Sequence, residues 1–422
     1  MRILVVGGGG REHALCWKIS KSPLSERLLC APGNAGTRAV AENVAVAADD
    51  AAGLAKTVRA EKVDLVVVGP EAPLVAGVGD RLRAEGALVF GPDAAGARIE
   101  GSKSFAKSLM RKFGIPTAPS RTFDSVGAAA DYLESVQSFP VVIKADGLAS
   151  GKGVVLPRTL AEAREAAEAM LVGGRFGDAG RRIVVEEFLR GRELSLLAAT
   201  DGRTLAVLES AQDYKRVRDR DEGPNTGGMG AVSPAPAATE EVLAAATREI
   251  LVRTVHALSR EGIAYRGCLY AGLMATRAGP RVIEFNCRFG DPETQVVLPR
   301  LTSDLVPLLR GAAEGRLADV TELSWDPRPA VCVVVAPAGY PEASSKGEEI
   351  RGLEAAADVP DVTVFHAGTA ALGDRVVTAG GRTLGVTALG ATVAEARSRA
   401  YEAVGRISFP GMHYRRDIGS DA

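Results

Sequence analysis

The sequence predicts an α/β protein with several domains, and three observations lead to this prediction. Short apolar runs alternate with amphipathic stretches over residues 1–100, a pattern typical of a parallel sheet covered by helices. A glycine-rich tip lies between two short apolar runs within residues 141–156, which predicts two strands joined by a turn. The chain of 422 residues is too long for one core of ordinary size, so we expect two to four domains.

The first hundred residues are expected to alternate strand and helix. We expect strands at 3–6, 27–30, 65–68 and 88–90, and helices at 11–21, 50–61 and 76–85. Ligands of such sheets bind beyond the carboxyl ends of the strands. The candidate binding segments are therefore the glycine-containing turns that follow strands, at 7–10, 32–37 and 69–73.

The rest of the chain predicts a larger mixed domain and then a smaller one. We expect helices at 102–113, 125–136, 160–171, 240–261 and 304–314, and strands at 141–144, 153–156, 182–188, 267–276 and 281–288, with two more within 192–210. Residues 212–230 are rich in charge and glycine and are expected to form a loop. Residues 325–329 resemble a linker, and residues 330–420 predict a small mixed domain closed by a helix at 393–407.

Composition excludes several classes of protein. The net charge of −1 provides no field that favours nucleic acid or an anionic membrane. The five cysteines form no Cys-x-x-Cys pair, which argues against a disulfide framework or a zinc site. No apolar run approaches the roughly 20 residues that a spanning helix needs. We therefore expect a soluble cytoplasmic protein that binds neither nucleic acid nor membranes.

The strand expected at 281–288 contains the most informative pattern. Because side chains alternate along a strand, Glu284, Asn286 and Arg288 share one face, about 7 Å apart, while Ile283 and its neighbours on the other face are expected in the core. Carboxylate and amide oxygens suit a magnesium ion that also binds phosphates, and a guanidinium binds an anion. The alternative is an amphipathic edge strand with a solvated polar face.

The glycine-rich tip at 147–153 is not a P-loop. Three residues rather than four separate Gly147 from Gly151, and Gly153 stands where Ser or Thr would bind magnesium. A strand follows the tip, whereas a P-loop needs a helix whose N-terminus faces the phosphates. A hairpin tip with backbone N–H groups and Lys152 could instead close over phosphates; a plain flexible hairpin is the alternative. Lys144 ends a strand that is expected to be buried and therefore needs an anionic partner.

Two further segments have weaker patterns. Residues 7–12 resemble a dinucleotide fingerprint, but Glu12 stands where its last glycine should be, which argues against a nicotinamide oxidoreductase. The glycines still permit a phosphate at the start of a helix. Residues 184–193 predict a strand that runs into a turn, whose backbone could pair with an adenine edge while Glu193 accepts from ribose hydroxyls. An ordinary strand and turn is the alternative there.

The sequence resembles the phosphoribosylamine–glycine ligases of the ATP-grasp superfamily over nearly its whole length. The matching motifs are those at 9–14, 31–36, 68–74, 100–103, 143–147, 223–230, 284–295 and 380–382. The resemblance implies an N-terminal parallel-sheet (Rossmann-like, pre-ATP-grasp) domain at 1–100, an ATP-grasp domain at 101–325 with a lid subdomain at about 115–187, and a small mixed α+β C-terminal domain at 326–422.

The resemblance also implies a reaction. ATP would activate glycine as glycyl phosphate, and the amine of 5-phosphoribosylamine would displace phosphate, giving glycinamide ribonucleotide, the second step of de novo purine biosynthesis. The implied metal is Mg²⁺, with Mn²⁺ as an alternative, and the implied assembly is a monomer or weak dimer. Another ATP-grasp carboxylate–amine ligase is the alternative function. A biotin-dependent carboxylase would be expected to contain a biotin-linked motif, which is absent here.

The resemblance assigns candidate residues to each ligand. Those for ATP are Lys103 and Lys144 at the phosphates, Ser150, Gly151, Lys152 and Gly153 in the covering loop, Glu186, Glu187, Phe188 and Leu189 at adenine, and Glu193 at ribose. Those for the metal are Glu284 and Asn286. The candidate substrate-binding residues are Gly9, Gly10, Glu12, Glu71, Asn225, Thr226, Gly227, Gly228, Asp291 and Arg382, and the candidate catalytic residues are Arg288, Asp213 and Lys215.

Three of these expectations are more specific. By charge complementarity, Arg288 and Asp291 would contact the carboxylate and the ammonium of glycine, while Glu71 and Arg382 would hold ribose hydroxyls and the 5-phosphate. Many ATP-grasp enzymes place an acid on the strand before the metal-binding strand, and residues 268–276 contain none. A second metal would therefore need Asp213, Glu293 or water.

Overall fold

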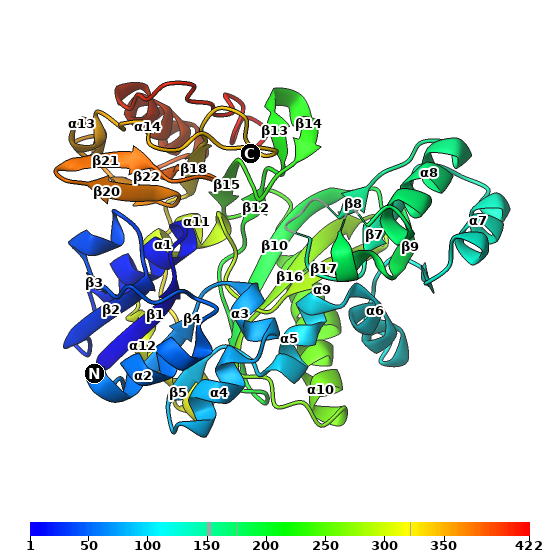
Figure 1. Ribbon diagram of the computed structural model, residues 1–422, viewed down its shortest axis with the longest axis horizontal. Helices are drawn as coiled ribbons and strands as arrows, with labels where there is room; N and C mark the ends of the chain where they lie inside the picture. The colour runs from blue at the N-terminus through cyan, green and yellow to red at the C-terminus, as the bar shows by residue number, and fades with distance from the viewer. Residues whose placement is uncertain (150–152, 175, 321) are drawn as a thin grey trace.

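The N-terminal hundred residues form a parallel sheet in the order β3-β2-β1-β4-β5. The computed structural model describes residues 1–149, 153–174, 176–320 and 322–422 (Figure 1). This region contains β1 (Arg2–Gly7), α1 (Gly10–Ile19), β2 (Arg27–Pro32), η1 (Thr37–Ala39), β3 (Glu42–Asn43), α2 (Ala51–Glu61), β4 (Leu65–Val68), α3 (Glu71–Val75), α4 (Val78–Ala84), β5 (Leu88–Phe90) and α5 (Ala94–Gly101). Strand β1 is buried on both faces, as a continuous apolar run in a parallel sheet predicts.

Residues 103–187 form a helix and a separate small subdomain. Helix α6 (Lys103–Lys112) leads into a sheet in the order β6-β9-β7-β8. Its elements are β6 (Ser120–Phe123), α7 (Val126–Ser135), β7 (Val141–Ala145), β8 (Val154–Val155), α8 (Leu160–Leu171), η2 (Gly177–Gly180) and β9 (Ile183–Glu187). The predicted hairpin is confirmed, because β7 and β8 pair antiparallel. In Figure 1 this subdomain projects to the right of the rest of the molecule.

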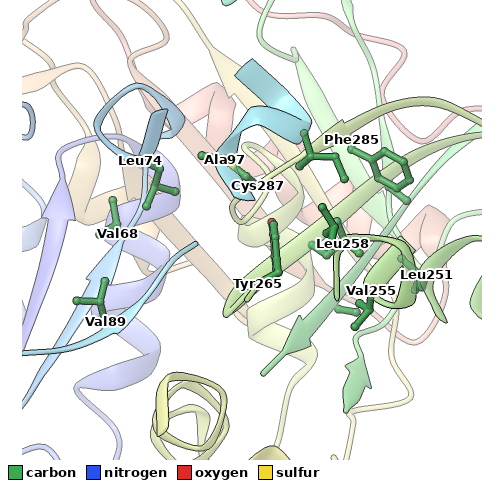
Figure 2. Packing of buried hydrophobic residues seen from close by; sticks show 14 of the residues in the cluster. Val68, Leu74, Val89, Ala97, Leu251, Val255, Leu258, Tyr265, Phe285 and Cys287 are labelled. Carbon is green, nitrogen blue, oxygen red and sulfur yellow. The ribbon is translucent and has the colours of Figure 1, made fainter. Parts of the chain in front are cut away.

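The central sheet has the antiparallel order β11-β10-β16-β17 and helices on both faces. Its elements are β10 (Arg192–Thr200), β11 (Leu205–Val207), α9 (Glu240–Ala246), the π-helical turn η4 (Thr247–Val252), α10 (Arg253–Arg260), β16 (Gly267–Thr276), β17 (Gly279–Asn286), α11 (Glu293–Arg300), α12 (Leu305–Glu314) and η5 (Leu317–Asp319). Figure 2 shows that Phe285 and Cys287 share one apolar cluster with Val68 and Val89 of the N-terminal sheet. The two regions therefore fold around a common core.

The C-terminal region is a mixed α/β layer above the N-terminal sheet (Figure 1). It contains β18 (Ala330–Val335), α13 (Leu353–Ala357), β19 (Val362–His366), β20 (Thr369–Leu372), β21 (Arg375–Thr378), β22 (Leu384–Leu389) and α14 (Val393–Arg406). Helix α14 contacts both β18 and β22. In the described part of the chain, no helix is long and apolar enough to cross a membrane.

The segment 212–233 differs from the predicted loop. It contains β12 (Gln212–Asp213), β13 (Arg216–Arg218), η3 (Asp219–Asp221), β14 (Glu222–Asn225) and β15 (Gly230–Ser233). Strands β12 and β15 extend the C-terminal sheet, whose order is β12-β15-β18-β22-β19. Local composition does not reveal these strands, because β12 pairs with β15, and β15 in turn pairs with β18, which lies about a hundred residues further along the chain. Pairing with β18 attaches the segment to the C-terminal region.

Candidate active site

The polar end of β17 is the centre of the candidate site. Glu284 and Asn286 lie on β17, and Arg288 follows the strand. As predicted, the three residues lie together: Arg288 Nη2 donates to Asn286 Oδ1 at 3.4 Å. Phe285 and Cys287 belong to the hydrophobic core on the opposite side.

A β-bulge sets the direction of these side chains. The pairing of β17 with β16 shifts between Val282 and Glu284, which leaves Ile283 without a direct partner. The predicted place of Ile283 in the core is therefore wrong, and Ile283 instead lines a small cavity together with Lys215. A bulge disrupts the ladder locally and leaves a residue unpaired, and here the carbonyl of Ile283 accepts from Lys144 Nζ at 2.9 Å.

Glu284 lies in a strongly positive environment. Its Oε1 is 3.7 Å from Lys215 Nζ. Burial alone would raise the pKa of Glu284, but nearby positive charges bring it below the ordinary value: those of Lys215, Lys144, Lys103 and Arg288. The carboxylate is therefore ionised at neutral pH, which is the form that binds a metal.

Glu284 and Asn286 fit a magnesium ion that is shared with phosphates. Among the described residues, no group of three or more His, Cys, Asp or Glu side chains could hold a metal by itself. Mg²⁺ commonly takes one or two protein oxygens and completes its octahedron with phosphate oxygens and water. One ionised carboxylate and one amide oxygen on the same strand match that requirement.

The two predicted phosphate lysines converge on this site from α6 and β7. Lys103 Nζ donates to the carbonyl of Gly147 at 3.1 Å, and burial lowers the pKa of Lys103. Lys144 Nζ lies 2.9 Å from Glu186 Oε1, the anionic partner that its buried position requires. Of the predicted loop residues, Gly153 lies within the described part of the chain, and its carbonyl accepts a hydrogen bond from the backbone N–H of Ala145. Three predicted loop residues lie outside the described parts of the chain: Ser150, Gly151 and Lys152.

Sequence reasoning missed Lys107. Its Nζ lies in the interior, 2.8 Å from both Glu186 Oε2 and Thr117 Oγ1. The Glu186 carboxylate is therefore held between two lysines, while Glu187, Phe188 and Leu189 follow at the end of β9, where Phe188 is exposed. Burial lowers the pKa of Lys107 to about 8. The only feature of the sequence that could have indicated Lys107 is its position one helical turn after Lys103.

Arg288 is held by two carboxylates. Its Nε donates to Glu71 Oε2 and its Nη2 to Glu100 Oε1, both at 3.1 Å. Burial raises the pKa of Glu71, but Arg288 and Arg11 outweigh it and lower that pKa overall. Glu100 also accepts from Cys287 N at 2.7 Å, so it links α5 to the end of β17. Glu100 belongs to a motif noted in the sequence but had no predicted role.

Residues from all three regions of the chain meet around Asp291. Arg382 Nη2, from the segment before β22, lies 3.3 Å from Asp291 Oδ2. Gly9, at the start of α1, is so close that a Cβ built on it would lie 3.5 Å from the same oxygen. Gly10 similarly faces Gln295 of α11. Glu12 is buried and accepts from Gly9 N at 2.6 Å, so it caps its own helix.

The predicted substrate loop lies between the central sheet and Arg382. Arg382 Nη1 donates to the carbonyls of Gly227 and Gly228 at 2.5 and 3.3 Å. Thr226 donates twice to the carbonyl of Lys215. Further along, Lys215 Nζ lies 3.3 Å from Glu193 Oε2, and Asn225 pairs with Arg216 in the β13–β14 hairpin.

Asp213 is half-buried beside these cations, and its Oδ1 atom is fully enclosed. Its Oδ1 has no hydrogen-bond partner among the described residues. Burial raises the pKa of Asp213 well above its ordinary value, and the charge of Glu293 raises it further. Glu293 in turn accepts from Ser195 Oγ at 3.0 Å and from Tyr270 OH at 2.8 Å. Tyr270 lies on β16, the strand on which the sequence places no acid, and neither it nor Ser195 had been predicted.

Comparison with protein families supports one assignment for the whole chain. Residues 1–100 match the family model described as phosphoribosylglycinamide synthetase, N domain. Residues 101–294 match the ATP-grasp (A) domain of the same family, and residues 330–421 match its C domain.

Individual relatives agree with the family models. A phosphoribosylamine–glycine ligase of Allochromatium vinosum is 53% identical, covering 100% of this chain and 99% of the relative, and one of Brucella melitensis is 51% identical, covering 99% and 97%. The crystal structure of the Thermotoga maritima phosphoribosylamine–glycine ligase has a TM-score of 0.86 at 36% identity, covering 99% of this chain and all of that one. A biotin carboxylase of Campylobacter jejuni, at 14% identity, shares the fold with a TM-score of 0.75, covering 100% and 94%. On these matches, the chain belongs to the phosphoribosylamine–glycine ligase family.

Proposed function

We propose that this chain ligates glycine to 5-phosphoribosylamine with ATP and Mg²⁺, releasing ADP and phosphate. The observation that supports it most directly is the ionised Glu284 beside Asn286, surrounded by Lys103, Lys144 and Lys215. Such a cluster suits a metal–triphosphate whose charge must be neutralised during transfer. The relatives named for this reaction match the chain from end to end.

In the first step, glycine's carboxylate oxygen attacks the γ-phosphorus of ATP, the bond to the β-phosphate oxygen breaks, and ADP leaves. Bound Mg²⁺ supplies charge neutralisation on the transferring group. Lys103 and Lys144 contact the phosphates from α6 and β7. Glycyl phosphate hydrolyses readily, so a lid that excludes water is part of the proposed mechanism.

In the second step, the amine of phosphoribosylamine attacks the acyl carbon and phosphate leaves. The nitrogen must lose a proton, and we assign the proton to Asp213. Its Oδ1 has no hydrogen-bond partner among the described residues, and burial raises the pKa of Asp213 above its ordinary value, so its carboxylate binds a proton more strongly than an ordinary aspartate does. Lys215, held between Glu193 and Glu284, balances the charge that develops beside it.

Substrate contacts follow from charge complementarity. We assign glycine's carboxylate to Arg288 and its ammonium to Asp291. Each already has a protein partner, so glycine would share the Arg288–Glu71 pair and the Asp291–Arg382 pair. Glu71 and Arg382 would also reach the ribose hydroxyls and the 5-phosphate.

We also propose the domain boundaries, the assembly, the location in the cell and the range of metals. The domains would be 1–100, 101–325 with a lid at about 115–187, and 326–422. The enzyme would act in the cytoplasm as a monomer or weak dimer, and Mn²⁺ could replace Mg²⁺.

The test is ADP release with Mg-ATP and glycine, with and without phosphoribosylamine generated from ribose 5-phosphate and ammonia. We expect ADP formation to require both substrates. Glu284→Ala should lower kcat about 100-fold or more, the scale expected for losing a group that stabilises transition-state charge. Glu354→Ala, which removes an exposed glutamate of α13, should leave kcat unchanged. ATP binding without turnover on this substrate pair would contradict the substrate assignment.

A further inference from the structure

The segment 413–421 lies along the hairpin that connects the proposed catalytic residues Asp213 and Lys215 to the 225–228 loop. His413 Nε2 lies 2.8 Å from the carbonyl of Val217. Arg416 N donates to Asp219 Oδ1 at 2.7 Å, and Asp417 Oδ2 accepts from Arg220 N at 2.8 Å. Each of these contacts joins residues about two hundred positions apart in the sequence. Together they follow the first strand and the tip of the hairpin.

Arg415 is the centre of this contact. Its side chain is only 2% exposed, although it is charged. Its Nε and Nη2 donate to the two carboxylate oxygens of Asp417, both at 2.8 Å. Its Nη1 donates to Asp221 Oδ1 at 2.7 Å and to the carbonyl of Arg216 at 3.2 Å. A planar guanidinium can make these forked contacts simultaneously, whereas a lysine ammonium cannot.

The tip of the hairpin has an unfavourable backbone conformation. Arg220 and Asp221 have φ values of +59° and +53°, in the left-handed region that side-chain-bearing residues rarely adopt. Such residues persist where surrounding contacts over-determine them. Here those contacts come from Asp417, which accepts from Arg220 N, and from Arg415, which binds the Asp221 carboxylate.

The base of the hairpin is held by the same segment. Tyr214 lies between Asp213 and Lys215 in the chain, and its side chain is buried in the core of the C-terminal region. Its hydroxyl donates to Asp421 Oδ1 and accepts from Gly419 N at 3.1 Å. The Arg415 guanidinium carbon lies 5.2 Å from the centre of the Tyr214 ring. Because Tyr214 points into the C-terminal region, its neighbours Asp213 and Lys215 point toward the central sheet.

We propose that Arg415 is a positioning residue for the second substrate: with Asp417 and Asp221 it clamps the 213–228 segment so that Asp213 and Lys215 stay beside Glu284. The inference rests on the proposed function, which places phosphoribosylamine under this segment. Most of the proposed ATP-binding residues lie on α6, β7 and β9, outside the clamped segment, and only Glu193 of β10 is assigned to ATP and also pairs with Lys215 of that segment. Loss of the clamp should therefore weaken the binding of phosphoribosylamine much more than the binding of ATP.

The test compares Arg415→Lys, Asp221→Ala and Tyr214→Phe with the matched control Arg399→Lys in the full-length enzyme. Arg399 also pairs with two carboxylates in the C-terminal region, Asp361 and Glu395. We expect Arg415→Lys to raise the KM for phosphoribosylamine tenfold or more, with the KM for Mg-ATP within twofold of wild type. Amide hydrogen exchange in peptides from 213–228 should be at least tenfold faster in Arg415→Lys, and unchanged in the control.

The outcomes separate this inference from the proposed function. Wild-type enzyme that does not turn over glycine and phosphoribosylamine would overturn the proposed function. Wild-type turnover, with equal changes in both KM values or with unchanged exchange in 213–228, would overturn the clamp. If Arg415→Lys does not fold, Asp221→Ala decides the question. The Asp221 side chain is largely exposed, and its removal breaks the bond between Arg415 and the hairpin tip while Arg415 keeps its bonds to Asp417, so a smaller selective rise in the KM for phosphoribosylamine is expected.

Discussion

At the scale of single residues, the buried charged side chains of this site lie beside side chains of opposite charge. Glu186 lies between Lys107 and Lys144, and Arg288 lies between Glu71 and Glu100. Removing one member of a buried pair leaves an uncompensated charge, which is strongly destabilising. Such networks hold their side chains in defined positions, so the site is preorganised before any substrate binds.

The backbone at Gly228 also holds a side chain of the site in a defined position. It has φ +110°, and a Cβ built on it would collide with Pro292 Cδ and lie 2.5 Å from Asp213 Oδ1. We expect Gly228→Ala to displace Asp213 and to lower kcat/KM for phosphoribosylamine about 100-fold, with a stability cost of about 1–3 kcal/mol.

The control is Gly86→Ala, because Gly86 has φ +87° with nothing within 4 Å of its built Cβ. It should lose stability without losing activity. Steady-state kinetics and chemical unfolding of both variants provide the comparison, and equal losses of activity in the two would contradict the crowding argument.

At the scale of elements, the contact between α1 and β19 depends on a neutral histidine. His13 Nδ1 accepts from the backbone N–H of His366 at 2.8 Å. Burial, followed by the charge of His366, lowers the pKa of His13 from 6.5 to about 3, and burial lowers that of His366 to about 4. Protonation of His13 at Nδ1 would remove the acceptor and break this contact.

The pH dependence of stability follows from these shifts. Between about pH 3 and 6.5 the unfolded chain binds the proton that folded His13 does not, so the free energy of unfolding falls as the pH is lowered from 6.5. One such group contributes a slope of at most about 1.4 kcal/mol per pH unit. His13→Asn keeps an acceptor near the position of Nδ1 and removes the titration, so urea unfolding between pH 4 and 6 should show a shallower slope.

The matched substitution His256→Asn, at an exposed position of α10, should keep the wild-type slope. A His13→Asn enzyme with the same pH dependence as wild type would show that the imidazole does not titrate as described.

At the scale of the whole molecule, the hydrophobic cores define which parts move together. One core joins the N-terminal sheet to one face of the central sheet, and a second joins the N-terminal sheet, α12 and β18. The core of the 120–187 subdomain contains buried residues only from 129 to 185. Because this core shares no buried residue with the other two, we expect the subdomain to open without disrupting them.

We expect hydrogen exchange to reveal this difference. Amides of α7, β7, α8 and β9 should exchange faster than those of β1 or β16 in the free enzyme, because only a small core must open. Saturating Mg-ATP should slow exchange in β7 and β9, the strands that contain Lys144 and Glu186. Mass spectrometry of peptides with and without nucleotide measures both effects, and ATP that changes exchange only outside residues 103–187 would contradict the proposed lid.

Much of the architecture could be predicted from local patterns. The apolar runs of β1, β2, β4 and β5 correctly predicted a parallel sheet. The short apolar runs on either side of the glycine-rich tip correctly predicted a hairpin. The strands within 212–233 could not be predicted from local patterns, because β15, with which β12 pairs, is itself paired with β18, a strand about a hundred residues further along the chain. The predicted helix at 76–85 begins only at Val78, because residues 71–75 form α3 and Gly77 separates the two helices with φ +86°.

The sequence by itself determined the chemical types at the site, the order of the three regions and the alternation that brings Glu284 and Asn286 to one face. Tertiary structure alone decided which charges meet: that Lys107 pairs with Glu186, that Glu100 receives Arg288, and that Arg415 holds the tip of a hairpin two hundred residues earlier. The physical reason is the distance along the chain over which each effect acts. Periodicity and turn chemistry act between residues a few positions apart, whereas the pairing of buried charges depends on where distant elements pack, which no local pattern encodes.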